Sequence, residues 1–389
     1  MCALPRGGRK DKKHITEANF DVHMILNSSV VRMMSQILSL TVISAIFATT
    51  SATCGTDMPI EPQPGNSESV TITVTDPNLG PVDRRFRIHI PAGYSDGNDV
   101  ETPLVLDLHG WTGYGGDWRK MDDVADEDPD GGFIAIHAQG YGDPSSGIKW
   151  QSWNCSRTDG PLGPPCVLPR PAGYETQCYD TCGQCDTINS CDWTACYDDT
   201  VFMRAMVDYV NDKYCLDMDS IHLTGYSNGG MFSYYAASQL NDILASITTN
   251  AASPLLGFGD VPLDPPISLL DFHGQLDGVI PYDSDSPFAN GEGPNNSVIS
   301  GDLYYYQQSP DTWGKWVYTM GCSGQKPYPT DMDGIDAWSC KIWSDCVDDK
   351  EVVHCTGDYG HDYPFSQETP SYIGGVRIMW DFMKAHRKN

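Results

Sequence analysis

Positive charge is scarce in this 389-residue chain. Lys and Arg together number 24 against 52 Asp and Glu, which gives a formal net charge of −28. Proteins that bind nucleic acid or anionic membrane surfaces need clustered Lys and Arg. The composition therefore argues against both kinds of partner and indicates an acidic, soluble surface, which by itself identifies no substrate.

Long apolar runs are also few. The clearest, residues 37–48 (ILSLTVISAIFA), is too short to span a bilayer and has the length of a signal-peptide core. Arg32 precedes it, and residues 51–53 offer small side chains for cleavage. We expect an N-terminal extension and signal peptide over 1–54, then a secreted domain over 55–389 without stable membrane insertion. An uncleaved anchor is the alternative.

A second C-x-x-C motif is missing as well. The chain has 14 cysteines, and five of them crowd between Cys178 and Cys196. Cys182 and Cys185 form one C-x-x-C, a motif found in half of a zinc site or in a redox pair. An exported chain with many cysteines favours disulfides over both alternatives. Residues 126–131 imitate the start of a calcium loop, yet His137 stands where the bidentate Glu belongs. We predict disulfides, a turn at 126–131, and no metal or cofactor.

No repeat, long linker or charge block divides the chain beyond its leader. Apolar patterning predicts strands alternating with helices, and hence a mainly parallel sheet covered on both faces. The predicted strands are 70–74, 86–90, 104–108, 133–136, 221–223, 268–272 and 351–354, and the predicted helices are 199–214, 228–240, 313–320 and 372–386. A Cys-rich stretch at 143–196 and a polar stretch at 283–311 interrupt this alternation, and we expect both to be insertions within one domain.

The sequence G-Y-S-N-G at residues 225–229 fits the pattern G-x-S-x-G. The pattern alone is weak, because glycines also relieve crowding at ordinary tight turns. Here a predicted strand precedes it and a predicted helix follows it, as a nucleophile turn at the edge of an α/β sheet requires. We therefore predict that Ser227 is a nucleophile.

A serine nucleophile needs a base and a carboxylate, which in this kind of fold follow it in the order acid, then His. Asp277 follows the strand 268–272, and His361 lies in a loop before the last helix, so we predict that these complete a triad with Ser227. The alternatives that rank lower by position are Asp271 and Asp283 for the acid, and His354 and His386 for the base.

The tetrahedral intermediate of such a reaction needs two backbone N–H donors. One should belong to Asn228, directly after the nucleophile. The other should come from the loop after strand 104–108, where the sequence reads His109-Gly110-Trp111. We assign the second donor to Trp111, with a simple tight turn at this position as the alternative.

These motifs resemble a known family. The segments L-H-G at 108–110, G-F-I-A-I-H-A-Q at 132–139, H-G-x-x-D-x-x-I-P-Y at 273–282 and G-H-D-Y-P at 360–364 are similar to exported esterases of the polyhydroxybutyrate depolymerase and feruloyl esterase type, in carbohydrate esterase family 1. The resemblance runs from about residue 70 to the C-terminus. It implies an α/β-hydrolase fold and serine ester hydrolysis without a cofactor, and it is not specific for substrate.

The resemblance implies feruloyl or acetyl esters of plant polysaccharide, or a polyhydroxyalkanoate-type polyester, as polymeric substrates. Trp111 stands where the family often has Cys, and Tyr363 where it often has Trp, and both positions line the acyl pocket in relatives. We expect substrate contacts from His109, Tyr226, Trp153 and Tyr363, and a lid or docking role for the Cys-rich insertion. The rival functions are a non-catalytic carbohydrate-binding or adhesion protein and a serine peptidase.

Overall fold

The computed structural model describes residues 54–55, 60–95, 98–113, 120–143, 148–175, 179–183, 186–262, 264–327, 338–362 and 372–388, all within one compact unit, Thr49–Asn389. The apolar run at 37–48 and Tyr363 lie outside these residues, so what the sequence predicts for them stays a prediction. Among the helices described, none combines the length and the apolar character needed to cross a membrane.

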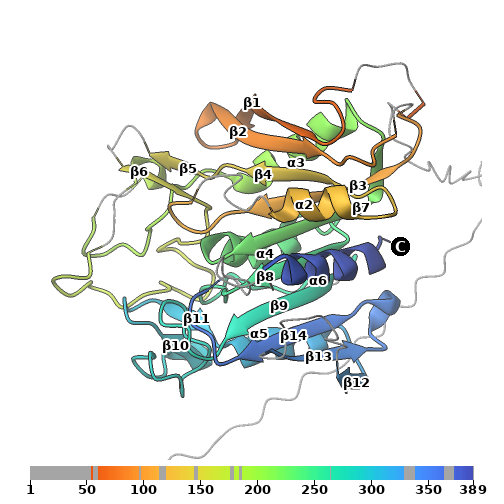
Figure 1. The fold of residues 1–389 in the computed structure, drawn as a ribbon. Helices are drawn as coiled ribbons and strands as arrows, with labels where there is room; N and C mark the ends of the chain where they lie inside the picture. The colour runs from red at the N-terminus through yellow and green to blue at the C-terminus, as the bar shows by residue number, and fades with distance from the viewer. Residues whose placement is uncertain are drawn as a thin grey trace, which may run out of the picture. The chain divides into compact units, whose positions relative to one another are not determined.

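One large sheet organises this unit (Figure 1). Ten strands in the described residues pair in the order β1-β2-β4-β3-β7-β8-β9-β14-β13-β12. The strands from β4 through β14 run parallel, and the strands at the two edges pair antiparallel. The predicted mainly parallel sheet is confirmed. The bounds are β1 Asn66–Asp76, β2 Gly80–Ile90, β3 Thr102–Leu108, β4 Ile134–Ala138, β7 Leu216–Tyr226, β8 Ser246–Asn250, β9 Ser268–Gly274, β12 Gly324–Pro327, β13 Ser339–Ser344 and β14 Val352–Gly357.

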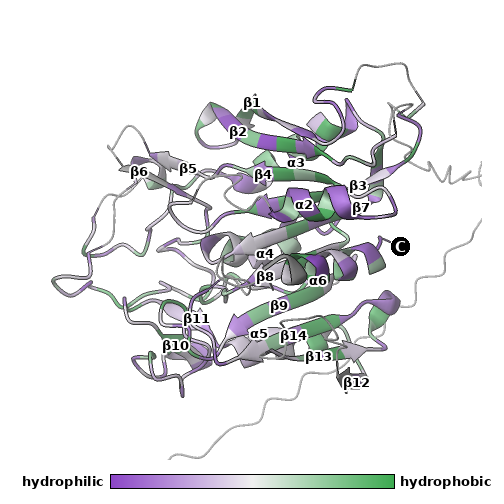
Figure 2. Cartoon of the chain, viewed as in Figure 1, coloured by the Kyte–Doolittle hydropathy of each residue, from purple (hydrophilic) through white to green (hydrophobic). Residues whose placement is uncertain are grey.

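Helices cover both faces of the sheet, as Figure 1 shows. On one face lie α2 (Lys120–Glu127) and α6 (Tyr372–Ala385), and on the other lie α3 (Asp199–Asn211), α4 (Asn228–Gln239) and α5 (Ser309–Thr319). Leu104 and Leu106 of β3 belong to one buried cluster, whereas Val105 between them belongs to the other. Strands such as β3 (TPLVLDL) and β4 (IAIHA) bury both faces and are mainly hydrophobic, and the loops are more hydrophilic (Figure 2).

The two stretches that interrupt the alternation lie at the same end of the sheet, on the left in Figure 1. Val167 N–H donates to Leu303 O at 3.0 Å, and Tyr305 N–H donates to Pro165 O at 2.9 Å, so the two stretches are joined through their backbones. The short elements here are β5 Tyr141–Asp143, β6 Ile148–Ser152, η1 Asp180–Cys182, η2 Pro294–Asn296, β10 Ser297–Ile299 and β11 Tyr305–Gln307, and one further turn, η3, covers Val347–Asp349 near β14.

Disulfides tie the described part of the chain together, as the sequence predicts. The pairs are Cys54–Cys215, Cys166–Cys191, Cys182–Cys196, Cys322–Cys346 and Cys340–Cys355. Cys155 is a buried free thiol. The bond from Cys54 to Cys215 links a residue that the sequence assigned to the leader to the folded unit, and the boundary expected at residue 54 stays a prediction.

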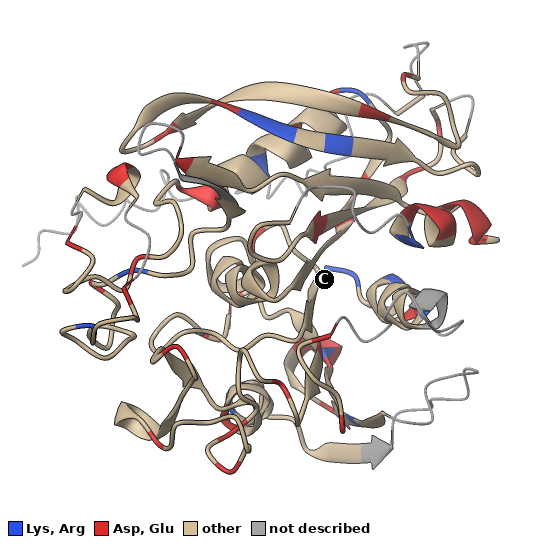
Figure 3. Cartoon of the chain, turned by 60° about the vertical axis from the view of Figure 1, so that its left-hand side comes forward, with Lys and Arg blue, Asp and Glu red and all other residues tan. Residues whose placement is uncertain are grey.

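Acidic residues are spread over the loops and are concentrated on α2 (Figure 3). Two arginines of β2 form ion pairs: Arg84 Nη2 lies 2.7 Å from Asp199 Oδ1, and Arg87 Nη2 lies 2.6 Å from Asp122 Oδ2. The charges of these two arginines are therefore matched within the molecule.

Asp122 also belongs to a buried ion cluster beneath α2. The Nδ1 atom of His137 lies 2.8 Å from Asp107 Oδ2, and its Nε2 atom lies 2.8 Å from Asp122 Oδ1. Burial alone would lower the pKa of His137, but hydrogen bonds and charge from the two carboxylates outweigh it and raise the pKa to about 9. The folded protein therefore holds a buried imidazolium between two carboxylates.

This cluster predicts that stability falls at alkaline pH. His137 has a pKa of about 9 in the folded state and about 6.5 in an unfolded chain. Its contribution is therefore complete below about pH 6.5 and is lost as the pH rises through 9, on the order of 3 kcal/mol in all. Urea unfolding between pH 6 and 9.5 measures this fall.

A matched variant separates His137 from other groups. Burial lowers the pKa of His222 to about 3, so its imidazole stays neutral over the same pH range. His222→Gln should keep the alkaline decline of the unfolding free energy, and His137→Gln should flatten it. Equal slopes in both variants would contradict the assignment.

Candidate active site

Ser227 occupies a strained turn between β7 and α4. Its backbone has φ 53° and ψ −120°, a positive φ that a residue with a side chain rarely adopts. Such a conformation costs roughly 1–3 kcal/mol, and it persists only where neighbours enforce it. Here Ser227 N–H donates to Asn250 O of β8 at 2.9 Å, and Met231 N–H donates to Ser227 O at 2.9 Å. The turn presents the hydroxyl at the carboxyl end of the sheet.

The glycines of the motif allow this turn to pack closely. A Cβ atom on Gly225 would lie 2.4 Å from the backbone carbon of Gly229, and one on Gly229 would lie 2.5 Å from Leu108 O. Because neither residue has a side chain, the start of α4 packs directly on the end of β3. The nucleophile turn and the loop after β3 are therefore adjacent.

Ser227, His361 and Asp277 meet as the sequence expected. His361 Nε2 lies 2.8 Å from Ser227 Oγ, and His361 Nδ1 lies 2.8 Å from Asp277 Oδ2. Asp277 is fully buried and the His361 side chain is 16% exposed. Of this acid–base pair, only the imidazole is therefore open to solvent. The Tyr226 hydroxyl donates to His361 O at 2.7 Å and holds the loop that carries the imidazole. This geometry suits proton transfer from a serine hydroxyl.

Asp277 is held in a cage that the sequence did not reveal. Its Oδ1 atom accepts hydrogen bonds from the backbone N–H groups of Val279 (2.8 Å) and Ile280 (2.9 Å). His273 Nε2 lies 3.5 Å from Asp277 Oδ2 and donates to Ile280 O at 2.9 Å. Burial would raise the pKa of Asp277, but hydrogen bonds from His273 and His361 outweigh it and hold the pKa well below its usual range. Asp277 is thus a fixed negative charge.

Asp271 and His354, which the sequence ranked lower as acid and base, pair with each other instead. His354 Nδ1 lies 2.8 Å from Asp271 Oδ2, and Asp271 Oδ1 accepts from Tyr234 (2.9 Å) and Thr249 (2.8 Å). Both Asp271 and His354 are buried on adjacent strands, β9 and β14. Their carboxylate and imidazole are therefore satisfied within the sheet.

A cavity of about 550 Å³ opens over Ser227 and His361. Six aromatic side chains line its wall: Trp111, Tyr174, Trp193, Tyr226, Tyr304 and Tyr306. The Cys-rich stretch contributes Tyr174 and Trp193, and the polar stretch contributes Tyr304 and Tyr306. Both interruptions of the sheet pattern thus form part of the pocket.

Arg170 fastens these two walls together. Its Nη2 atom donates to Asp302 O at 2.7 Å, its Nε atom donates to Tyr174 O at 2.8 Å, and its guanidinium lies 4.7 Å from the centre of the Tyr304 ring. The side chain is buried and borders the pocket. Sequence reasoning missed this residue, because a single Arg in a Pro-rich stretch gives no signal of long-range contacts.

The expected substrate contacts are only partly found at the pocket. Tyr226 lines it, whereas His109 and Trp153 are 2% and 0% exposed and lie behind its wall. Both side chains are buried and have no free surface for the substrate contact that the sequence predicted. Trp111 is 39% exposed at the pocket and packs edge-on against Trp193, with ring centres 5.7 Å apart.

The two expected oxyanion donors lie on adjacent segments. Asn228 is the first residue of α4, whose N-terminus favours developing negative charge. Trp111 lies in a turn closed by Gly113 N–H, which donates to Gly110 O at 3.0 Å, and Thr112 N–H donates to Gln151 O at 2.8 Å. A Cβ on Gly110 would lie 3.3 Å from Ser227 Cβ, so this turn contacts the nucleophile. The assignment of both N–H donors stays a prediction.

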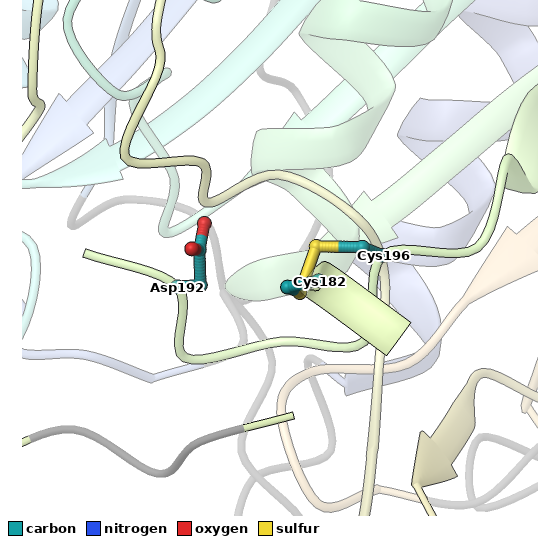
Figure 4. Close-up of side chains that lie close together, drawn as sticks. All are labelled: Cys182, Asp192 and Cys196. Carbon is teal, nitrogen blue, oxygen red and sulfur yellow. A yellow bond between two sulfur atoms is a disulfide. The ribbon is translucent and has the colours of Figure 1, made fainter. Parts of the chain in front are cut away.

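One group of metal-ligating residue types occurs in the described part of the chain, at Cys182, Asp192 and Cys196 (Figure 4). The two sulfur atoms are bonded to each other, so neither is a thiolate that could bind zinc. The Asp192 carboxylate accepts hydrogen bonds from Thr158 and Ser190. This group is therefore a disulfide beside a satisfied carboxylate.

The run that imitates a calcium loop is likewise used for packing. Asp126 Oδ1 lies 2.8 Å from His89 Nε2 and accepts from Ala92 N–H at 2.8 Å. Asp128 accepts from Lys384 of α6 at 3.1 Å and from the Trp380 indole. These carboxylates fix the end of α2 against β2 and α6.

Known proteins with similar sequences are esterases. Feruloyl esterase B of Piromyces equi is 23% identical over 304 residues, which cover 77% of this chain and 45% of that protein. A bifunctional acetylxylan esterase/xylanase of Neocallimastix patriciarum is 24% identical over 160 residues, covering 36% of this chain and 22% of that protein. The chain spans less than half the length of these curated relatives. They confirm the resemblance stated from the motifs.

A comparison with solved structures matches the acetyl xylan esterase from Aspergillus awamori, with 14% identity, a TM-score of 0.42, and coverage of 79% of this chain and 99% of that one. A ferulic acid esterase from Anaeromyces mucronatus has 16% identity, a TM-score of 0.33, and coverage of 58% and 78%. Residues 103–311 match the alpha/beta hydrolase fold family. With more than half of its length matched in this way, the chain belongs to the alpha/beta hydrolase fold family.

Proposed function

We propose that the chain is a secreted serine esterase that cleaves carboxylic esters with Ser227, His361 and Asp277, without a cofactor. The observation that carries this proposal is the relay of two 2.8 Å contacts from Ser227 Oγ through His361 to Asp277, at the floor of an open pocket. A serine hydroxyl is a weak nucleophile unless a positioned base removes its proton.

In the first half of the reaction, Ser227 Oγ attacks the ester carbonyl carbon while His361 Nε2 takes the hydroxyl proton. The carbonyl oxygen becomes an oxyanion, which the backbone N–H groups of Asn228 and Trp111 stabilise. Asp277 stabilises the imidazolium. When the bond to the alcohol breaks, His361 returns the proton to the leaving oxygen, and an acyl-enzyme remains.

In the second half, water replaces the alcohol. His361 Nε2 takes a proton from the water, whose oxygen attacks the acyl carbon to give a second oxyanion. Collapse of this intermediate breaks the bond to Ser227 Oγ, and the proton returns to that oxygen. The products are one carboxylic acid and one alcohol, and the protein is unchanged.

For the substrate, we propose feruloyl or acetyl esters of plant polysaccharide, with a polyester of the polyhydroxyalkanoate type as the alternative. The pocket of about 550 Å³ with its aromatic wall supports a ring-bearing acyl group or sugar, because aromatic faces pack well on both. The names of the relatives point the same way: a feruloyl esterase and an acetylxylan esterase.

Secretion is supported by the disulfides of the described residues, since such bonds persist in oxidising compartments. Expression of the full chain in a secreting host, followed by N-terminal sequencing of protein from the medium, tests this proposal. Retention of the uncut chain in the cell would contradict it.

Covalent labelling tests the enzymatic proposal directly. A fluorophosphonate should modify the wild-type protein at one site, on the peptide that contains Ser227, and should abolish hydrolysis of p-nitrophenyl acetate in proportion to labelling. A protein that neither reacts nor hydrolyses the ester would instead be a binding protein on this scaffold. Methyl ferulate, acetylated xylan and polyhydroxybutyrate film, compared side by side, then identify the ester class.

A further inference from the structure

We propose that Trp153 is a positioning residue that holds both arms of the oxyanion hole at a fixed separation. The inference rests on the proposed function, because it concerns how the donors for that reaction are placed. Trp153 follows β6 in the Cys-rich stretch and is 0% exposed. It acts through Asn228 and His109 and does not touch substrate.

The first arm is held through the side chain of Asn228. Trp153 N–H donates to Asn228 Oδ1 at 2.7 Å, and Asn228 Nδ2 donates to Trp153 O at 3.2 Å. The side-chain amide thus pairs with the backbone of Trp153 in both directions. Asn228 is itself 0% exposed, and its Nδ2 atom also donates to Cys155 Sγ at 2.7 Å, so the side chain is fixed while its backbone N–H begins α4 beside Ser227.

The second arm is held through the indole. Trp153 Nε1 donates to His109 O at 2.8 Å, directly before the turn that carries Trp111. His109 Nε2 accepts from Gly140 N–H at 2.9 Å, so the ring proton is on Nδ1, which donates to Gly110 O at 2.6 Å. The carbonyl oxygens of His109 and Gly110 therefore both accept hydrogen bonds. These two bonds fix the orientation of the peptide group between Gly110 and Trp111, which carries the Trp111 N–H.

Trp153 also fills the space between the two arms. Its ring stacks on Phe232 of α4, with ring centres 6.0 Å apart and planes 26° apart, and lies 5.1 Å from the His109 ring. Trp153 thus contacts both segments that supply the expected oxyanion donors, the start of α4 and the loop after β3. Misplacing a catalytic group by about 1 Å can cost roughly 10²-fold in rate, so the separation set here should matter for the transition state more than for the bound ester.

The test removes the indole N–H together with part of the ring volume. Trp153→Phe leaves an aromatic ring but removes the donor to His109 O. We expect kcat on p-nitrophenyl acetate to fall roughly 10- to 100-fold with KM within about twofold, because the lost contact acts on the oxyanion. Affinity for a trifluoromethyl ketone, whose tetrahedral adduct carries an oxyanion, should fall by a similar factor.

The control is Trp380→Phe in α6. Trp380 is also buried and also donates its indole N–H, to Asp128, but it lies outside the pocket. A merely structural role for Trp153 predicts that both variants lose thermal stability and keep kcat. If Trp153→Phe does not fold, 3-benzothienylalanine at position 153 keeps the bicyclic shape and removes the N–H, and the same fall in kcat is expected.

Failure of this inference is distinct from failure of the proposed function. A wild-type protein without hydrolysis or labelling refutes the esterase proposal. An active wild type, with Trp153→Phe equal to Trp380→Phe in kcat and in ketone affinity, refutes only the positioning role.

Discussion

Replacing Ser227 by alanine should lower kcat/KM for ester hydrolysis by roughly 10⁵- to 10⁶-fold, as loss of the nucleophile does in serine hydrolases of other folds. The hydroxyl is the atom that forms the acyl bond, and His361 Nε2, 2.8 Å away, is left with no proton to accept. A small rate above that in water should remain, because the oxyanion donors still bind the developing charge.

The variant should fold normally. Alanine and serine tolerate a positive φ about equally, so the strain at φ 53° is unchanged, and the backbone bonds of this turn do not involve the hydroxyl. Thermal unfolding and rates on p-nitrophenyl acetate measure both parts of the prediction. Ser238→Ala, near the other end of α4, is the matched control and should retain full activity. A Ser227→Ala rate within tenfold of the wild type would remove Ser227 from the mechanism.

The sequence predicted the elements around the nucleophile because their signals are local. Each predicted strand and helix overlaps an observed one, and β3, β7 and α4 supply the strand, turn and helix that place Ser227. Asp277 and His361 follow because loops after parallel strands share one edge of the sheet. The chain order of the three residues then needed no information about distant contacts.

The strand β8 shows where apolar patterning fails. Its sequence, SITTN, is polar, yet all five residues are buried. Thr248 Oγ1 donates to Thr224 Oγ1 at 2.7 Å, and Thr249 Oγ1 donates to Asp271 at 2.8 Å, so neighbouring strands satisfy the hydroxyls. The β-branched residues were the available signal, because they favour strands regardless of polarity.

The residues that form the wall of the pocket could not be predicted from the sequence, for a different reason. His109 and Trp153 stand in aromatic-rich segments, which suggest substrate contact, but their burial depends on how the Cys-rich stretch folds over β3 and α4. Arg170 and Tyr304 meet across more than 130 residues of sequence through contacts that no local pattern encodes. Such positions are decided by tertiary packing alone.

The second large effect is expected at Asp277. Asp277→Asn should lower kcat by about 10⁴-fold with little change in KM. The carboxylate accepts a hydrogen bond from His361 Nδ1, so the free lone pair of the imidazole is on Nε2, facing Ser227. An asparagine side chain can present its N–H₂ group to Nδ1 instead, which places the ring proton on Nε2, where it cannot act as a base.

The surroundings of Asp277 decide how this loss depends on pH. Burial would raise its pKa, but hydrogen bonds and charge from His273 and His361 hold the pKa well below the usual range, so the wild-type carboxylate stays ionised throughout any practical assay. Loss of wild-type activity in mild acid must therefore come from another group, and a pH–rate profile of kcat should show no step due to Asp277. Asp283→Asn, at the alternative acid in the sequence, is the control and should remain active. If Asp277→Asn kept its activity while Asp283→Asn lost it, the relay drawn from Ser227 through His361 would have to end on a different carboxylate.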